Sequence, residues 1–409
     1  MLAINGGEPY RNTKSKPFPA RTPYGEDEIQ LVSKALRSQN LFRWGGKFTA
    51  DFEAQFAKTY GSKFGVGSTS GTAALHLAIG ALDPDPGDEV ITSAITDIGT
   101  IIPILSQNAV PVFADMNIHT LTVDPHDIEQ NITSKTRAII AVHLFGNACQ
   151  MDILSEISKR YNIPLIEDCS QAHLTRHKGK YLGTFGNIGC FSFQQSKHMT
   201  TGDGGMSITN DHELDLRMRR FMDKSFDRSQ EGSRTYGSLG MNYRMTELHS
   251  AVGLAQLKKL TDIVDRKTFL GNRLSENIRD IPGITPAPVT PGTKHSYWSY
   301  PMLVTRYSTK SFTEALIAEG ISASAGYIGD PIFECSAALA EHRTYGSSQF
   351  PFDSLYTNRS FEQIQTLCPQ TRKILDRLVL LPFNENFSNE DVDDIAGGVR
   401  KVAEELETC

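Results

Sequence analysis

Apolar and polar positions between about residues 60 and 210 alternate between two patterns. Short runs rich in β-branched and aromatic residues are typical of buried strands, and the segments between them repeat their apolar positions with a helical period. The expected strands cover residues 63–67, 89–92, 111–114, 137–144, 164–167, 189–193 and 206–209, and the clearest helices cover 72–82 and 152–161. Strands that alternate with helices predict an α/β domain around a mostly parallel sheet, with helices on its faces.

The pattern changes after residue 246. A partial apolar stripe predicts one long helix from about 246 to 279, and a run of prolines then indicates a loop. Apolar runs at 297–304 and 377–381 predict strands of a smaller α+β unit, and Ser388 is a cap for the final helix. We therefore expect a large domain over residues 1–265 and a small C-terminal α+β domain over 266–409. The first few dozen residues could pack on either one.

The composition of the chain argues against several classes of function. The net charge of −6 is spread along the chain and provides no basic surface for nucleic acid. The chain starts without the apolar core of a signal peptide and has no run long enough to span a bilayer, so we expect a cytoplasmic protein with no membrane partner. The six cysteines lack CxxC pairing and metal-ligand spacing with a histidine, which favours free thiols and no metal site.

Lys197 occupies an unusual place for a lysine. An apolar run with Phe191 and Phe193 leads into it, and hydroxyl and glycine residues at 200–205 follow. Most lysines are solvated surface groups, but one held near apolar side chains has a lowered pKa and is a nucleophile. Asp168 ends another expected strand, at the sheet edge where such folds bind ligands. An amine, a strand-end carboxylate and hydroxyl and glycine turns are what a protein needs to hold pyridoxal 5'-phosphate (PLP).

Neighbouring segments supply groups of the same kind. Ser70, Gly71 and Thr72 lie between an expected strand and a helix start, where amides and hydroxyls bind phosphate, although ordinary helix caps have the same composition. Gln171 follows Asp168 by three residues and could donate to the 3-oxygen of the cofactor ring.

Four other polar residues are candidates with ordinary alternatives. Ser192 and Thr201 lie on either side of Lys197 and are candidate phosphate or loop donors. Asn242 could donate to a phosphate oxygen, although a turn before a helix explains it equally well. His173 is expected to be a hydrogen-bonded structural histidine that could support Asp168.

Together, four ordered motifs resemble the DegT/DnrJ/EryC1/StrS aminotransferase family, the sugar aminotransferases of PLP fold type I. The resemblance extends from about residue 24 to the C-terminus. The motifs are Ser70-Gly71-Thr72, Glu167-Asp168-x-x-Gln171-Ala172-His173, the segment 191–205, and Gly240-x-Asn242-x-Arg244-Met245.

The resemblance implies a role for each matching residue. Lys197 would carry PLP as a Schiff base, Asp168 would pair with the pyridinium nitrogen, and Gln171 would contact the ring oxygen. The residues that would hold the phosphate are Gly71, Thr72 and Ser192. The family's sites form across a dimer interface, so a homodimer is implied in which Asn242 reaches the phosphate of the neighbouring subunit. The implied fold is a large α/β domain with a smaller C-terminal domain.

Three positions test this resemblance. Where the family usually stacks an aromatic ring on the cofactor, this chain has Asp97. Where many nucleotide-sugar enzymes have His-Pro, it has Gln194-Gln195, which resembles the branch that aminates cyclitol ketones. A dehydratase branch replaces the lysine with histidine, but counting back from residues 200–202 places Lys197, and not His198, at the motif position.

We therefore expect a PLP-dependent aminotransferase that moves an amino group from glutamate or glutamine to a nucleotide-linked keto-sugar in amino-sugar biosynthesis. Lys197, once released, would move the proton between substrate and cofactor. The alternatives are amination of a keto-cyclitol of the scyllo-inosose type, a PLP-dependent sugar dehydratase, and a non-enzymatic sensor with the same fold. Candidate substrate contacts are Trp44, Asp97, Tyr297 and Tyr327.

Overall fold

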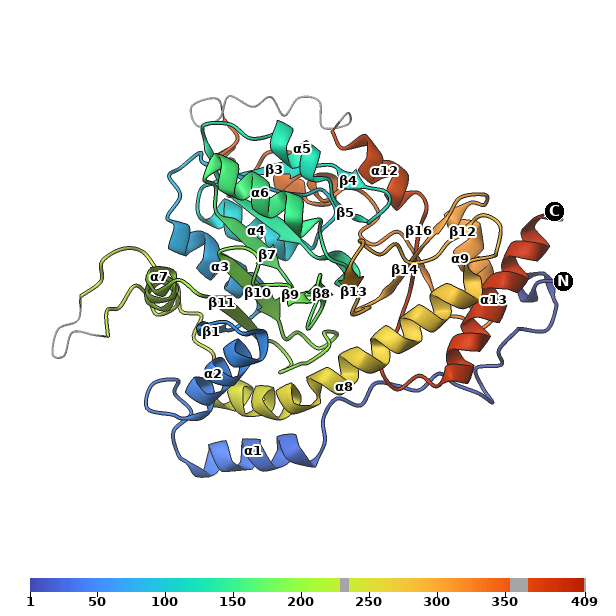
Figure 1. Cartoon of the computed structure of the whole chain (residues 1–409), viewed down its shortest axis with the longest axis horizontal. Helices are drawn as coiled ribbons and strands as arrows, with labels where there is room; N and C mark the ends of the chain where they lie inside the picture. Colours follow the sequence, from blue (N-terminus) through green and yellow to red (C-terminus); the bar gives the residue numbers. More distant parts are fainter. Residues whose placement is uncertain (229–234, 354–366, 408–409) are drawn as a thin grey trace.

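The computed structural model describes residues 1–228, 235–353 and 367–407. A seven-stranded sheet with the order β1-β11-β10-β7-β6-β2-β3 forms the centre of its larger part (Figure 1). The strands are β1 (Phe64–Ser68), β2 (Glu89–Ser93), β3 (Val110–Ala114), β6 (Thr136–Val142), β7 (Leu165–Asp168), β10 (Ile188–Ser192) and β11 (Gly205–Thr209). Only β11 runs antiparallel to its neighbours in this sheet, which confirms the prediction of a mostly parallel sheet.

Helices pack against this sheet along its whole width. They are α2 (Phe48–Tyr60), α3 (Gly71–Leu82), α4 (Ile98–Ser106), α5 (Pro125–Gln130), α6 (Met151–Tyr161) and α7 (His212–Met222). The two clearest helices expected from the sequence are α3 and α6. Short strands complete this part, namely β4 (Met116–Asn117), β5 (Thr122–Val123), β8 (Arg176–His177), β9 (Lys180–Tyr181) and β13 (Thr293–Lys294).

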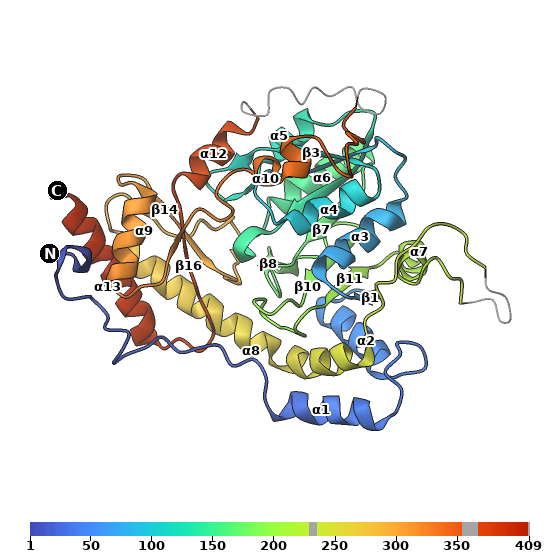
Figure 2. The same ribbon diagram turned by 180° about the vertical axis from the view of Figure 1, so that it is seen from behind.

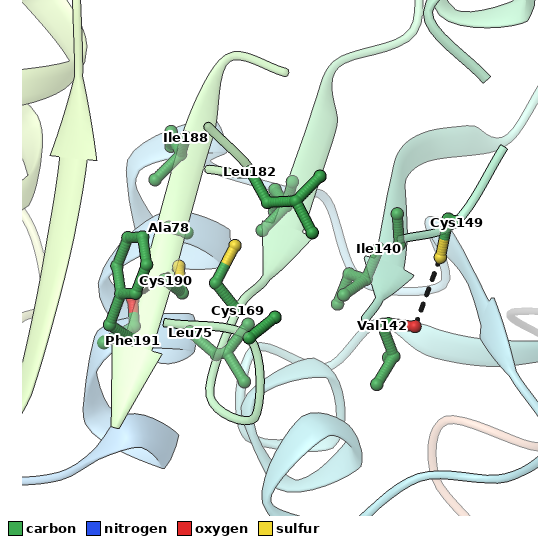
Figure 3. Packing of buried hydrophobic residues seen from close by; sticks show 14 of the residues in the cluster. Leu75, Ala78, Ile140, Val142, Cys149, Cys169, Leu182, Ile188, Cys190 and Phe191 are labelled. Carbon is green, nitrogen blue, oxygen red and sulfur yellow. Dashed lines mark hydrogen bonds between the residues drawn. The ribbon is translucent and has the colours of Figure 1, made fainter. Parts of the chain in front are cut away.

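The main core lies between the sheet and these helices. Figure 3 shows part of it, where Leu75 and Ala78 of α3 lie near Cys190 and Phe191 of β10. Five cysteines in the described part of the chain are free, as expected, and Cys409 lies outside the described residues. Burial in this apolar core raises the pKa of the Cys190 thiol well above its usual range, so it serves packing.

A smaller sheet forms the second part of the molecule (Figure 2). Its strands, in order across the sheet, are β12 (Ile284–Thr285), β14 (Tyr300–Val304), β16 (Leu378–Leu381) and β15 (Ser324–Ala325). Helices α9 (Thr309–Ala318) and α13 (Asn389–Glu407) pack beside it, and α10 (Ile332–Cys335), α11 (Ala337–Ala340) and α12 (Pro369–Leu375) lie in its connections. Ser388 and Asp391 exchange hydrogen bonds and cap α13, as the sequence predicts.

One long helix, α8 (Glu247–Ile278), joins the two parts. Val264 belongs to the main core, whereas Leu270 belongs to the core of the smaller part. The expected domain division at residue 265 falls between these two contacts and stays a prediction. The N-terminal segment crosses both parts, because Leu2 lies in the smaller core and α1 (Glu26–Arg37) packs on α8.

Two further features of the chain path bear on function. The described residues between α7 and α8 project from the body of the molecule in both views (Figures 1 and 2). We call residues 223–228 and 235–245 the α7–α8 arm. Among the described residues, none of the helices combines the length and the apolar character that a bilayer crossing requires.

Candidate active site

The carboxyl ends of β7 and β10 and the starts of α3 and α4 surround a cavity of about 370 Å³. Cofactor and substrate sites of open α/β sheets form at this edge because the loops there converge. The cavity is lined by seven of the eight residues that the sequence singles out as catalytic or cofactor-binding: Ser70, Gly71, Thr72, Asp168, Gln171, Ser192 and Lys197. The structure therefore brings these side chains together, and their individual roles stay predictions.

The start of α3 forms one end of the cavity. Ser70 caps the helix, and its hydroxyl accepts a hydrogen bond from the amide of Ala73 at 3.0 Å. A methyl group on Gly71 would lie 2.6 Å from Cβ of Ser192, so only glycine allows the end of β10 to approach the helix this closely. The result is a helix N-terminus flanked by the hydroxyls of Thr72 and Ser192, which is an anion-binding arrangement.

Asp168 is buried at the end of β7, and two donors fix its carboxylate. The hydroxyl of Thr100 donates to one oxygen at 3.0 Å, and the amide of Ser170 donates to the other at 3.1 Å. Thr100 in turn exchanges a hydrogen bond with the hydroxyl of Thr96 at 2.6 Å. A carboxylate held in this way has one orientation, which suits the pairing with a cationic ring nitrogen.

Lys197 enters the cavity from the loop that follows β10. Burial lowers the pKa of its amine to about 8, against the opposing effect of the Asp168 and Asp97 carboxylates. Its ammonium group lies over the indole ring of Trp298. An amine with this pKa has a substantial unprotonated fraction near neutral pH, which a nucleophile requires.

Gln171 is held at the cavity wall by two hydrogen bonds. Its side-chain oxygen accepts from the amide of Phe145 at 2.7 Å, and its side-chain nitrogen donates to the hydroxyl of Tyr327 at 3.0 Å. Strand β6 ends at Val142 and not at residue 144 as expected, because the chain turns after the strand to make the first of these hydrogen bonds. Phe145 has a φ of 58° in the short turn after the strand, which directs its amide toward Gln171.

Asp97 lies at the rim of the cavity as the cap of α4. One of its oxygens accepts from the amide of Gly99 at 2.8 Å. Its side chain is exposed and is therefore available to a ligand. The helix cap explains why a short acidic side chain occupies this position, where the resemblance implies an aromatic ring.

Glu167, the neighbour of Asp168, has a structural role. Its carboxylate accepts from the amides of Gly183, Phe185 and Gly186 at 2.7–2.8 Å and from the ring of His143 at 3.1 Å. His143, Glu167 and Cys169 offer ligand atoms within 4.8 Å of one another. However, the other ring nitrogen of His143 accepts from the amide of Cys149, and burial raises the pKa of Cys169 to about 12. We interpret this cluster as a hydrogen-bond network because its lone pairs are already used.

The structure places several of the residues predicted as site residues away from the cavity or without the expected contacts. Tyr297 is buried in the smaller core, where its hydroxyl donates to Asn272 at 3.0 Å. Trp44 lies outside the cavity, and its ring nitrogen donates to Asp223. Thr201, by contrast, is a loop donor, one of its two expected roles: it donates to the carbonyl of Asp203 at 2.6 Å and does not line the cavity. Neither ring nitrogen of His173 has a hydrogen-bond partner among the described residues, so it does not support Asp168.

Asn242 does not line the cavity of its own chain. It is exposed on the α7–α8 arm. Thr100 and Trp298 also line the cavity, although neither was predicted from the sequence as a site residue. The sequence offered one signal for each residue. Thr100 is a hydroxyl residue about one helical turn after Asp97, and Trp298 is an aromatic residue next to Tyr297.

The larger sheet, the smaller C-terminal part and the lysine–carboxylate cavity define the fold of PLP-dependent transferases of fold type I. The chain belongs to the DegT/DnrJ/EryC1/StrS aminotransferase family, whose model matches residues 23–400. It is an aminotransferase.

Individual relatives and a solved structure are similar to this chain over most of its length or a large part of it. The chain is 35% identical over 78% of its length to a putative L-glutamine:3-amino-2,3-dideoxy-scyllo-inosose aminotransferase of Micromonospora echinospora, of which 78% is covered. It is 38% identical over 63% of its length to GDP-perosamine synthase of Escherichia coli O157:H7, of which 70% is covered. The crystal structure of 3-amino-5-hydroxybenzoic acid synthase superimposes with a TM-score of 0.85 at 26% identity, covering 95% of this chain and 99% of that one.

Proposed function

We propose that the chain binds PLP at Lys197 and transfers an amino group from glutamate or glutamine to the ketone of a sugar in amino-sugar biosynthesis. The observation that carries this proposal is the convergence of the Lys197 amine, the Asp168 carboxylate and the start of α3 on one cavity. PLP, when bound, supplies an electron sink for the substrate carbon that loses its proton. The absence of a Cβ at Gly71 lets Ser192 approach the start of α3, which places its hydroxyl beside the helix amides that would bind the phosphate.

Each residue has a task that its geometry permits. The amides at the start of α3, with Thr72 and Ser192, would bind the phosphate. Asp168, oriented by Thr100, would keep a ring nitrogen protonated. Lys197 would form the covalent attachment and, once released, would move a proton as a general base, because a pKa near 8 lies close to the working pH.

The position of His198 supports amination over dehydration. Its ring nitrogen contacts the carbonyl oxygen of Ser296 at 3.0 Å, it is buried, and it does not line the cavity. The group that faces the cofactor space is therefore the lysine. A dehydratase of this family would carry a histidine there.

The charges of the cavity favour a second candidate acceptor, a keto-cyclitol of the scyllo-inosose type. Among the described residues that line the cavity, Lys197 is the only lysine or arginine, whereas Asp97, Asp168 and Asp203 are carboxylates. A nucleotide-linked sugar carries a diphosphate, which needs cationic partners, but a cyclitol carries only hydroxyls. The exposed Asp97 carboxylate would accept hydrogen bonds from such hydroxyls.

We further propose a homodimer in which Asn242 of one subunit completes the phosphate site of the other. Asn242 is exposed on the α7–α8 arm, and Leu239 and Tyr236 on the same arm are 92% and 55% exposed. Apolar side chains this exposed on an extended segment indicate an interface. We also propose a cytoplasmic location, which the free thiols of the described cysteines support.

The covalent attachment is tested with Lys197→Ala. Purified wild-type protein incubated with PLP and reduced with borohydride should retain cofactor on the peptide that contains Lys197, and Lys197→Ala should retain none. The exposed residue Lys58 provides the control Lys58→Ala, which should behave as wild type. Cofactor trapped in Lys197→Ala would refute the lysine assignment.

The transfer itself is tested with an isotopically labelled amino donor. Loaded enzyme is incubated with labelled glutamine or glutamate, freed of the donor, and offered nucleotide-linked keto-sugars and inososes in parallel. Label in a sugar amine supports the keto-sugar acceptor, and label in an aminocyclitol supports the second candidate. Loss of the substrate hydroxyl without transfer of label would instead identify a dehydratase.

A further inference from the structure

The backbone around Lys197 is held by side chains from distant parts of the chain. Four consecutive carbonyl oxygens, those of residues 195–198, each accept a side-chain hydrogen bond. Arg21 donates to the carbonyls of Gln195, Lys197 and His198 at 3.2, 2.5 and 2.5 Å. The indole nitrogen of Trp298 donates to the remaining one, that of Ser196, at 2.9 Å. These carbonyls lie beyond the end of β10 at Ser192, so the ladder of the large sheet does not fix them.

Arg21 is itself anchored in the smaller part of the molecule. Its Nε donates to the carboxylate of Glu385 at 2.8 Å, and the two side chains are 17% and 13% exposed. Glu385 lies between β16 and α13, whereas Arg21 lies in the N-terminal segment before α1. The guanidinium group therefore connects the loop of Lys197 to a segment outside the large sheet.

The side of the loop that faces Trp298 is fixed in a similar way. The buried amine of Lys267 on α8 donates to the carbonyl of Trp298 at 3.2 Å and to that of Phe383 at 2.7 Å. The indole ring, which contacts the Lys197 ammonium, is thus held at its backbone and at its ring nitrogen. Both groups that bind the loop carbonyls are anchored by charged residues from outside the large sheet.

From these contacts we infer that Arg21 is a positioning residue, which orients the backbone of Lys197 so that its amine points at the cofactor space. Arginine suits this task because its planar guanidinium offers five donors in fixed directions, and lysine cannot reproduce them. Displacement of a reacting group by about 1 Å is enough to cost a large part of a catalytic rate. This inference rests on the proposed function of Lys197, and it adds a residue that does not touch the cavity.

The experiment compares Arg21→Gln and Arg21→Lys with the control Arg37→Gln, which alters an exposed arginine of α1. Apoprotein is titrated with PLP, and the dissociation constant, the visible absorption band and the pH dependence of that band are recorded. The kcat and KM of transamination and the apoprotein's thermal midpoint are measured separately.

We expect Arg21→Gln to weaken PLP binding by about 10-fold or more, the loss that charged hydrogen bonds predict. Its absorption band should titrate at a different pH, and its kcat should fall by a larger factor than its KM rises. Arg21→Lys should resemble Arg21→Gln, and Arg37→Gln should match the wild type. If Arg21→Gln keeps the wild-type affinity and spectrum, or only lowers the thermal midpoint, the inference is refuted.

If Arg21→Gln does not fold, Glu385→Ala decides the question. It removes the carboxylate that orients the Arg21 guanidinium toward the three loop carbonyls, so a positioning role requires these contacts to loosen in the variant. A shifted band and weaker PLP binding support the inference, and wild-type values refute it. Wild-type protein without trappable cofactor on Lys197 would refute the proposed function itself, whereas a loaded wild type with unchanged variants would refute only the role of Arg21.

Discussion

The ammonium group of Lys197 lies 4.2 Å from the centre of the Trp298 indole ring. The ring has two opposing effects on the lysine. It attracts the cation through its π face, and it excludes water from the amine. Burial lowers the pKa of Lys197, and the indole ring is one of the groups that contact the buried amine. We therefore expect the exclusion of water by the ring to outweigh its attraction for the cation.

Replacement of Trp298 by alanine should therefore raise the pKa of Lys197 from about 8 toward the usual value of 10.5. The measurement is the rate of PLP attachment to apoprotein between pH 7 and 10, because only the unprotonated amine attacks. Each unit by which the pKa rises lowers the rate at pH 7 by about 10-fold. Trp298→Phe, which keeps an aromatic cover but loses the hydrogen bond to Ser196, should keep the pH midpoint close to that of the wild type. A midpoint that moves to lower pH in Trp298→Ala would show that attraction to the ring dominates.

Two substitutions at and beside Asp168 should slow the half-reaction to different extents. Asp168→Asn removes the negative charge and should slow the half-reaction with the amino donor by about 10²–10³-fold. Thr100→Val removes one hydrogen bond worth about 1 kcal/mol and should slow it by about 5-fold. Single-turnover absorbance measurements give both rates.

The control for Thr100 is Thr92→Val, a buried hydroxyl on β2 that donates to the carbonyl of Ile140 and not to Asp168. It should leave the half-reaction unchanged. Asp168→Asn at the wild-type rate would show that the carboxylate does not act on the cofactor ring.

The close contact between Gly71 and Ser192 predicts a loss of cofactor affinity in Gly71→Ala. The added methyl group would meet Cβ of Ser192 at 2.6 Å, and overpacking of this kind typically costs about 1–3 kcal/mol. We expect the PLP dissociation constant to rise by about 5-fold or more. Gly25→Ala, whose methyl group meets its nearest atoms at 3.8 Å, is the control, and equal losses in both variants would contradict the explanation.

The elements of the large sheet and most of the cavity were predictable because their signals are local. Asp168 and Ser192 end apolar runs, and the carboxyl ends of neighbouring parallel strands meet at one edge. Trp298 was missed because Tyr297 has a φ of 48°, which interrupts the alternation of the strand pattern and leaves Tyr297 in the core and Trp298 in the cavity. Arg21 could not be predicted because its contact with Gln195 joins residues 174 positions apart.

The burial of the His173 ring should make the free energy of unfolding depend on pH. Its ring is fully buried, and burial lowers its pKa to about 3, with smaller contributions from Lys197 and Arg21. The unfolded chain, with a pKa of 6.5, therefore binds more protons than the folded chain between about pH 3 and 6.5. The contribution of His173 to stability is complete above pH 6.5 and is lost as the pH falls through this window.

His173→Leu should therefore reduce the dependence of the free energy of unfolding on pH between 6.5 and 4. The slope should decrease by up to ~1.4 kcal/mol per pH unit, the effect of one proton. Urea unfolding of the apoprotein at several pH values measures this slope, and the comparison is independent of any loss of stability that is the same at every pH. His126→Gln, at an exposed position, should leave the slope unchanged. An unchanged slope in His173→Leu would mean that the buried ring is already protonated or reaches water in the folded protein.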